Sequence, residues 1–455
     1  MRDLLVAGFV ILSLPACFRR PFIGLLLFTL LAYMRVQDLT WGWARYERWS
    51  FYVAIVTLAG FVFAKQEDKR LFLPDMRSWI MVGLMAVVGV SLLASDNLRA
   101  GDFENYTEYC KIIGVALFTT AVVRTRDHLR LLIWVIALSF GFFGAKNGAN
   151  FIAHAGNMFI NQGPGGMMAD NNDFALALAM AVPLLMHLGL SDRRDIVRRV
   201  TLALVPLTIF TIIATHSRGG FLALGVGLMV LAWRSRNRFA GFAVLILMVV
   251  AGFLAAPQSY IERISTIRDY QTEGSAKGRL DAWKVAGNMI AERPMLGVGF
   301  EKFQQNYRRF DPNATDESES GPGTRVAHNS YLQIWAECGT VAFLLYMVLI
   351  GWSFFDLWRL RREAERRYHS SWILSYATMF EASMAVFVVG SFFLNRAHFD
   401  LFYHFVAVIL VFTTLARRAM RDETLYPLRS TERARLALER RRGFAPSTRT
   451  VTAGT

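Results

Sequence analysis

The chain has 455 residues, of which 54% are hydrophobic, and 36 of them are Phe. This composition lies far from that of an average soluble domain and indicates an integral membrane protein. The formal net charge of +15 could serve nucleic-acid binding. The basic residues, however, concentrate in short segments between apolar runs, so we expect no nucleic-acid partner.

Apolar runs separated by short polar segments follow one another along the chain. A helix needs roughly 20 residues to cross the hydrocarbon layer, so several runs must tilt or borrow flanking residues. We predict an all-α integral membrane protein with about twelve transmembrane helices. The first two runs could form two tilted helices or one re-entrant pair, which leaves the side of the N-terminus open and a count of about twelve or thirteen. The runs are residues 4–17, 21–36, 51–64, 79–94, 109–123, 131–153, 174–190, 200–215, 221–233, 239–256, 331–355, 372–394 and 400–416.

Basic and poorly basic loops alternate between these runs. Lys and Arg are frequent in residues 65–70, 124–130, 193–199, 234–238 and 359–367 and in the tail after Arg417. This is the positive-inside pattern, which places the basic segments in the cytoplasm. The prediction is a multi-pass protein of the bacterial inner membrane whose other loops face the periplasm. These loops are residues 95–108, 154–173, 216–220, 257–330 and 395–399.

Four parts are predicted along the chain. Residues 1–256 are assigned to N-terminal transmembrane helices, and residues 257–330 to a large periplasmic loop with amphipathic helices. Residues 331–417 are assigned to C-terminal transmembrane helices, and residues 418–455 to a partly disordered cytoplasmic tail.

Helical periodicity replaces high hydropathy within the large loop. Residues 276–292 predict an amphipathic helix that lies on the membrane. Pro294 and the glycines after it end this helix, and residues 301–310 predict a second, short helix. Residues 311–323 have loop composition and are expected to be mobile. The apolar face of the first helix carries Leu280, Trp283, Ala286 and Ile290.

The cysteines support neither a disulfide framework nor a zinc site. Cys17, Cys110 and Cys338 lie in or beside apolar runs and have no paired spacing. Residues 14–17 resemble a lipoprotein cleavage box, but another apolar run follows at once, so we predict a membrane helix there.

An arginine occupies the outward hinge between two runs, at residues 215–220. Arg218 is followed there by Gly219 and Gly220. The alternative to a functional role is an interface anchor at a helix end. We favour phosphate binding, because the glycines allow close approach to the backbone and a guanidinium grips two oxygens without losing its proton.

A second arginine opens the predicted amphipathic helix. Arg279 lies one turn before Trp283. Taken alone, Arg279 fits a solvated face. The apolar stripe of this helix would press it onto the membrane surface, where lipid headgroups lie, and this favours a functional role.

A histidine stands at the outer rim of the run that begins at Tyr331. His328 shares a helical face with Tyr331, beside a polar stripe that contains Asn329 and Glu337. A histidine that caps a helix is the structural alternative. An imidazole beside a wet loop is also the natural general base for a hydroxyl nucleophile. Two arginines and a base on one side of a membrane predict a site for a lipid pyrophosphate and an alcohol.

Other polar residues are weaker candidates. Lys146 follows the Gly-rich end of a run and could add a cation to the outward face. Asp170 and Asp173 could offer carboxylates to a divalent metal, but a plain loop is the stronger interpretation. For Arg396 and His398, ligand contact and helix capping cannot be separated.

Four motifs occur in the order found in the O-antigen ligase family, which the chain resembles strongly over residues 200–355. The N-terminal part is also similar to the O-glycosylation ligases found beside exosortase systems. The motifs are Thr215-x-Ser217-Arg218-Gly219, Gly278-Arg279-x-x-x-Trp283, Pro294-x-Leu296-Gly297-x-Gly299 and His328-Asn329-x-x-Leu332-x-x-x-x-Glu337-x-Gly339.

The resemblance implies an inverting, metal-independent glycosyltransferase of the integral-membrane GT-C class, without a cofactor. The expected donor is an O-antigen glycan on undecaprenyl pyrophosphate, and the expected acceptor is a sugar hydroxyl of the lipid A core. Arg218 and Arg279 would hold the pyrophosphate, and His328 would activate the acceptor. The protein is expected to contact membrane lipids and to be a monomer. Further expected substrate-binding residues are Asn329, Tyr331, Trp283 and Lys146.

Three alternatives stay open. A protein O-glycosylation ligase or an O-antigen polymerase would use the same donor and nearly the same residues, and only the acceptor would differ. A lipid-linked glycan flippase belongs to another class. It should carry charges deep within its spans, whereas the candidate residues cluster at one rim.

Overall fold

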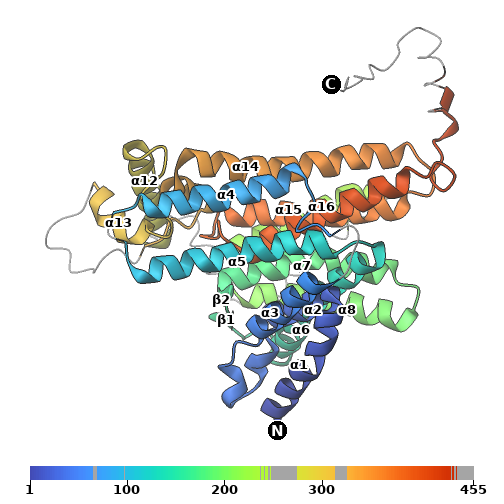
Figure 1. Cartoon of the computed structure of the whole chain (residues 1–455), viewed down its shortest axis with the longest axis horizontal. Coiled ribbons are helices and arrows are strands. Elements are labelled where there is room, and N and C mark those ends of the chain that lie inside the picture. Colours follow the sequence, from blue (N-terminus) through green and yellow to red (C-terminus); the bar gives the residue numbers. More distant parts are fainter. Residues whose placement is uncertain are drawn as a thin grey trace.

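The computed structural model of the protein describes residues 1–64, 69–96, 98–235, 274–312 and 325–431, and single positions in 237–246 and after 431. Nearly all secondary structure within these residues is helical, as Figure 1 shows, so the all-α prediction is confirmed. A short antiparallel hairpin of β1 (Gln162–Gly165) and β2 (Met168–Asp170) lies between two long helices.

Helices overlap every predicted apolar run; of the run 239–256 only residues 239, 241–243 and 246 are described, and these are helical. Two short 3₁₀ helices, η1 (Val36–Leu39) and η2 (Trp43–Arg45), lie in the N-terminal part. The α-helices are α1 (Arg2–Arg19), α2 (Pro21–Tyr33), α3 (Trp49–Phe63), α4 (Met76–Leu93), α5 (Ala100–Val122), α6 (Arg126–Ala153), α7 (Asn171–Ser191), α8 (Asp195–Ala214), α9 (Arg218–Arg234), α12 (Gly274–Glu292), α13 (Phe303–Phe310), α14 (Ser330–Glu365), α15 (Ser371–Ser391) and α16 (Asp400–Met420).

The described helices define a multi-pass membrane protein. Seven of them, α4, α6, α7, α8, α14, α15 and α16, are long and apolar enough to cross a bilayer. This number is smaller than the predicted count of about twelve spans. The difference has three causes. α2, α3 and α9 have only 13, 15 and 17 residues, charged residues lie in α1 and in the first half of α5, and most of the run 239–256 lies outside the described residues.

Three helices form the centre of the bundle. The apolar window of α7 is 83% buried, and those of α16 and α15 are 78% and 67% buried. α7 packs against α6, α8, α9 and α15, which explains why it is apolar on all sides. The corresponding window of α8 is only 22% buried, so α8 presents most of its apolar surface outward.

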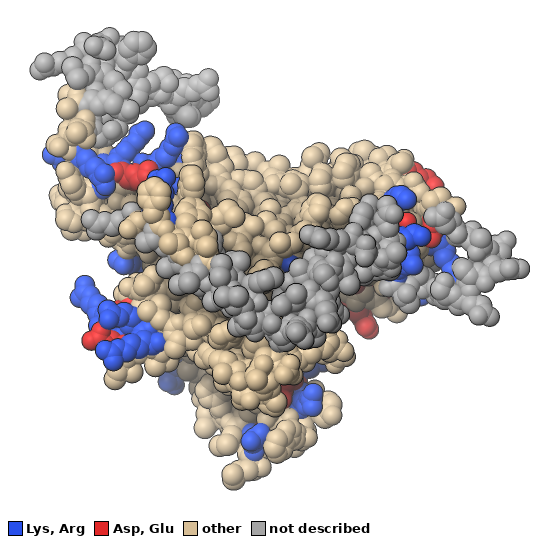
Figure 2. Space-filling view, turned by 180° about the vertical axis from the view of Figure 1, so that it is seen from behind, with Lys and Arg blue, Asp and Glu red and all other residues tan. Residues whose placement is uncertain are grey.

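The bundle has two chemically different ends. We call the end that carries α12 and α13, at the left of Figure 1, the α12 end. At the opposite end, which we call the basic end, Arg130 contacts Asp192 at 3.0 Å and Arg126 lies 4.3 Å from the ring centroid of Trp372. Figure 2 shows Lys and Arg gathered at this end and a mixture of charges at the other. Thus the basic loops predicted at 124–130 and 193–199 lie together.

The first two apolar runs form two separate helices, an arrangement that both two tilted helices and a re-entrant pair would have. α1 ends at Arg19, and α2 begins two residues later with Pro21. The hydroxyl of Tyr33, the last residue of α2, forms a hydrogen bond of 2.8 Å with Nδ1 of His404, the fifth residue of α16. α2 therefore runs from the basic end towards the α12 end.

The predicted amphipathic helix and short helix are present as α12 and α13. The buried stripe of α12 is Ala282, Val285, Ala286 and Met289, which packs with α13 and the start of α14. It shares only Ala286 with the predicted apolar face, and Leu280 is 43% exposed. The loop expected to be mobile at 311–323 and the tail beyond 437 lie almost entirely outside the described residues.

Candidate functional site

Arg218 is the first residue of α9, at the α12 end of the bundle. Ser217 caps this helix, because its hydroxyl accepts a hydrogen bond from the Gly220 amide at 3.1 Å. The Arg218 side chain is exposed, whereas Gly219 and Gly220 are buried. A Cβ at Gly219 would come within 2.9 Å of Phe393, and one at Gly220 within 2.6 Å of Ala175. The paired glycines thus bring α9 close to its neighbours and leave the guanidinium at the rim.

His328 lies two residues before α14, on a turn with the left-handed φ of 46°. Its imidazole is mostly buried, and burial is the main cause that lowers its pKa from the usual value. The positive charge of Arg279 lowers the pKa further, and the carboxylate of Asp170 opposes the shift. The start of α7, the first part of α12 and the start of α14 therefore meet around this histidine.

Trp283 anchors the turn that carries His328. Its indole N–H donates a hydrogen bond of 2.8 Å to the carbonyl of Ala327. Its ring meets Phe392 edge-on at a centroid distance of 5.4 Å. The tryptophan therefore positions the histidine through the backbone of the preceding residue.

Asn329 and Tyr331 use their polar groups within the protein. The side-chain oxygen of Asn329 accepts hydrogen bonds from the amides of Tyr331 and Leu332 at 3.0 and 3.1 Å and so caps α14. The Tyr331 hydroxyl donates to the carbonyl of Val388 at 2.8 Å. These contacts explain why α14 begins directly after His328.

Lys146 lies apart from this group. It is an exposed residue of α6, seven residues before the helix ends at Ala153. Within the described part of the chain, no recorded contact joins it to Arg218, Arg279 or His328.

The segment of residues 392–399 joins the separate parts of the site, and sequence reasoning underrated it. Arg396 forms an ion pair with Asp173 on α7, and its amide donates to the Ser330 hydroxyl at 2.9 Å. Ser330 in turn donates to the carbonyl of Leu394 at 2.8 Å. Because Phe392 contacts Trp283 and Phe393 contacts Gly219, this segment lies between α12 and α9.

The third and fourth sequence motifs form one unit of paired backbone. α14 breaks at Gly339, where φ is 79° and ψ is −179°. The Gly299 amide donates to the carbonyl of Glu337 at 2.9 Å, and the Thr340 amide donates to that of Pro294 at 2.8 Å. A Cβ at Gly339 would lie 2.1 Å from the carbonyl oxygen of Met295. Glycine is therefore required here both for its backbone angle and for this close approach.

A second polar cluster adjoins this unit. The buried carboxylate of Glu337 accepts hydrogen bonds from Gln333 Nε2 at 3.3 Å and from the Phe303 amide at 3.4 Å. His398 Nε2 lies 3.8 Å from the same carboxylate. The fully buried Lys302 pairs with Asp102 at 2.8 Å, which ties the α12 region to α5. The signal that could have found this cluster is Glu337 itself, a carboxylate inside an apolar run.

The carboxylates considered for a metal make other contacts. Asp170 caps α7, because its side chain accepts from the Asn172 amide at 2.8 Å. Asp173 is paired with Arg396. Within the described ranges, no group of three or more His, Cys, Asp and Glu side chains has the arrangement of a metal site.

The fold and the site define an all-helical, multi-pass membrane protein with arginines and a histidine gathered at one end of its bundle. Residues 202–347, which contain Arg218, Arg279 and His328, match the model of the O-antigen ligase family. This part of the chain is therefore similar to the O-antigen ligase domain of that family. Residues 1–211 match a second model, described as a family of unknown function (DUF5935).

The chain is also similar to a protein of Rickettsia conorii (strain ATCC VR-613 / Malish 7) named "Putative polysaccharide ligase RC0486". The two sequences are 27% identical over 158 residues, which cover 34% of this chain and 38% of that protein. The chain thus matches little more than a third of the relative's length. Together the comparisons support a ligase role, while the similarity to exosortase-associated ligases stays a prediction.

Proposed function

We propose that this protein transfers an O-antigen polysaccharide from undecaprenyl pyrophosphate to a sugar hydroxyl of the lipid A core. It would act as an inverting, metal-independent glycosyltransferase of the GT-C class. The basic end of the bundle would face the cytoplasm and the α12 end the periplasm of a bacterium, in line with the positive-inside rule.

One observation carries this proposal. Arg218, Arg279 and His328 all lie in residues 202–347, the part of the chain that matches the O-antigen ligase model, and the charge of Arg279 acts on the His328 imidazole at the end of the bundle where Arg218 begins α9. A cation beside a neutral base suits a reaction in which a negative leaving group departs while a hydroxyl loses its proton.

The proposed reaction is a single displacement at the anomeric carbon of the donor. The acceptor oxygen attacks the anomeric carbon of the donor, and the bond between that carbon and the pyrophosphate oxygen breaks with its electron pair leaving on the pyrophosphate. His328 takes the hydroxyl proton. Attack from the face opposite the leaving group inverts the configuration. Arg218 and Arg279 stabilise the charge that develops on the pyrophosphate leaving group, a role that a divalent cation could also take.

The test is reconstitution of the purified protein in liposomes with lipid-linked glycan. Separate reactions contain lipid A core, a second lipid-linked glycan or an acceptor peptide. Sugar transfer to lipid A core is the expected result. Transfer to the second donor would identify a polymerase, and transfer to the peptide a protein ligase.

A further arm of this experiment tests the metal-independent mechanism. Treatment with EDTA should leave the transfer rate unchanged, because two guanidiniums supply the positive charge. Loss of turnover that magnesium or manganese restores would contradict this part of the proposal, and Asp170 and Asp173 would then be examined as ligands.

A further inference from the structure

Two cavities open side by side at the basic end of the bundle. The larger, of about 450 Å³, lies where α1 passes into α2 and where α5 ends and α6 begins. Its polar lining consists of Arg19, Arg20, Arg124 and His128. The smaller, of about 190 Å³, has Arg70, Arg124 and Arg418 in its lining. Arg124 lines both, so the two cavities adjoin. We call them together the basic cavities.

The charge of these linings has a single sign. Five arginines contribute to them, and none of the described lining residues is acidic. The cation of Lys69 adds to this field, because its Nζ lies 5.5 Å from the ring centroid of Phe61, a lining residue of the larger cavity. Concentrated positive charge at the mouth of a cavity attracts an anion, and guanidiniums match the geometry of phosphate oxygens.

The remaining wall of the larger cavity is apolar. Phe22, Leu26, Phe61 and Leu131 line it. Phe22 stacks on the imidazole of His128 with a centroid distance of 3.8 Å and an interplanar angle of 11°, and Leu131 is 48% exposed at the outer surface of α6. A soluble phosphate would make no use of these side chains, whereas the glycerol backbone and acyl chains of a lipid would pack against them.

We infer that the basic cavities bind the phosphate of an anionic membrane phospholipid, with its acyl chains along the apolar wall. The place of the cavities supports this ligand, because they lie where helices end, at the basic end of the bundle. Basic pockets between transmembrane helices at the positive side of a membrane protein are the kind of site that anionic headgroups occupy. This site lies at the opposite end from Arg218 and His328 and is independent of the transfer reaction.

The test measures lipid binding by the full chain in detergent. Native mass spectrometry records bound phosphatidylglycerol or phosphatidylcholine, and a thermal unfolding series with each lipid gives an apparent affinity. The variant R20Q/R124Q removes two cations from the larger cavity. The matched control R193Q/R199Q removes two exposed arginines at the same end that line neither cavity.

Wild type and control should bind phosphatidylglycerol in preference to phosphatidylcholine. R20Q/R124Q should lose roughly thirtyfold in affinity for phosphatidylglycerol, as expected for two arginines near a headgroup. Equal loss in the control, or equal binding of phosphatidylcholine by wild type, would overturn the inference, because either result would describe a general surface effect.

Two further arms complete the test. Glycerol 1-phosphate offers the headgroup phosphate without acyl chains. If it stabilises the protein as strongly as phosphatidylglycerol, the site binds a soluble phosphate and the inference of a lipid is wrong. The variant L131W fills the apolar side without changing charge and should also weaken lipid binding. It provides a test if R20Q/R124Q does not fold, and unchanged binding in L131W would contradict the inference.

Discussion

His328 is held in a backbone conformation that few residues other than glycine adopt, with a φ of 46°. The hydrogen bond from Trp283 to the Ala327 carbonyl holds one side of it, and the cap formed by Asn329 holds the other. Such strained positions are kept where neighbouring contacts determine the conformation, and they are frequent at functional sites. These contacts therefore hold the backbone that carries the imidazole.

The first prediction concerns the pKa of His328. Burial and Arg279 lower it, so the neutral base persists below the usual value of about 6.5 and the rate should fall only on stronger acidification. H328A should lose about 10²–10⁴ in rate and retain donor affinity within a few-fold. Transfer rate against pH and binding of lipid-linked glycan are measured together. If H328A loses the donor as badly as arginine variants do, the histidine is a pyrophosphate ligand or a cap.

Removal of the neighbouring charge tests the same pKa without catalysis. In R279Q the His328 resonance should titrate at higher pH than in wild type, because a cation that disfavours the imidazolium is gone. Nuclear magnetic resonance of labelled protein records the shift. An unchanged midpoint would show that Arg279 does not face the imidazole in solution.

The second prediction concerns the two arginines. R218A and R279A should abolish transfer with near-normal folding, and lysine should restore little activity because it offers a point charge without the guanidinium fork. K277A is the matched control, since Lys277 is exposed on the same helix as Arg279. Normal transfer by R218A would remove Arg218 from the site.

At the scale of the element, the break in α14 places the site. The long helix begins at the α12 end and turns at Gly339, where the segment of Pro294 and Gly299 pairs with its backbone. This pairing fixes α12, and with it Arg279 and Trp283, relative to His328. The glycines of the sequence motifs thus allow the close packing of α12 against α14 that positions the site.

The third prediction follows from that break. G339A should lower stability by about 1–3 kcal/mol from backbone strain alone, and the clash with the Met295 carbonyl should add to it. G351A on the same helix is the control, because a Cβ there meets nothing within 4 Å and alanine favours helix by about 1 kcal/mol. Thermal unfolding and transfer rate are measured for both. Equal stability of the two variants would show that the break is not needed.

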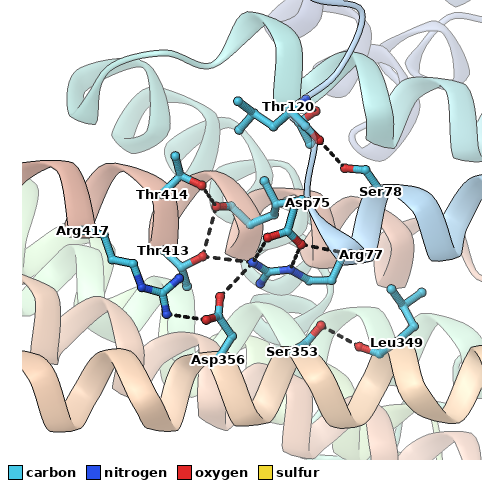
Figure 3. Close-up of polar contacts among 12 residues, drawn as sticks. Asp75, Arg77, Ser78, Thr120, Leu349, Ser353, Asp356, Thr413, Thr414 and Arg417 are labelled. Atoms are coloured by element: carbon cyan, nitrogen blue, oxygen red, sulfur yellow. Dashed lines mark hydrogen bonds and ion pairs between the residues drawn. The ribbon is translucent and has the colours of Figure 1, made fainter. Parts of the chain in front are cut away.

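At the scale of the whole molecule, a buried ionic cluster joins three helices near the basic end. Figure 3 shows Arg77 of α4 between Asp75, Asp356 of α14 and Thr413 of α16. The Arg77 side chain is fully buried and lies 2.8 Å from Asp356, which also pairs with Arg417. The cluster joins α4, α14 and α16 at the end opposite the candidate site. It therefore fixes the positions of these helices relative to one another.

The fourth prediction tests this cluster. D356N should destabilise the protein by up to about 3–5 kcal/mol, because it removes one of the two carboxylates that pair with buried Arg77 and leaves only the partly exposed Asp75. E363Q is the control: Glu363 lies 3.7 Å from Arg417, but its side chain is 38% exposed, so the change should cost at most about 1 kcal/mol. Unfolding temperatures in one detergent compare the variants. A small effect of D356N would contradict the prediction and show that Asp75 or water is enough to stabilise the Arg77 charge.

The sequence by itself determined that this is an all-helical membrane protein, because long apolar runs must pair their backbone groups internally when no water is present. It also placed Arg218 and His328 at the starts of helices, since polar residues that interrupt apolar periodicity lie where a helix ends, whereas Arg279, expected to open its helix, is the sixth residue of α12. The number of membrane-spanning helices was predicted less accurately from the sequence. Short helices such as α2 and partly polar helices such as α5 depend on neighbouring helices for burial.

Only the tertiary structure decided which polar residues meet. The pair of Asp173 and Arg396 joins positions 223 residues apart, and the contact between Arg77 and Asp356 joins positions 279 residues apart. The local sequence pattern cannot predict such long-range pairs, because each of the segments involved could pack against several other segments. The effect of Arg279 on His328 arises in the same way: packing of the paired backbone at Gly339 brings α12 to the start of α14, and their charges then interact.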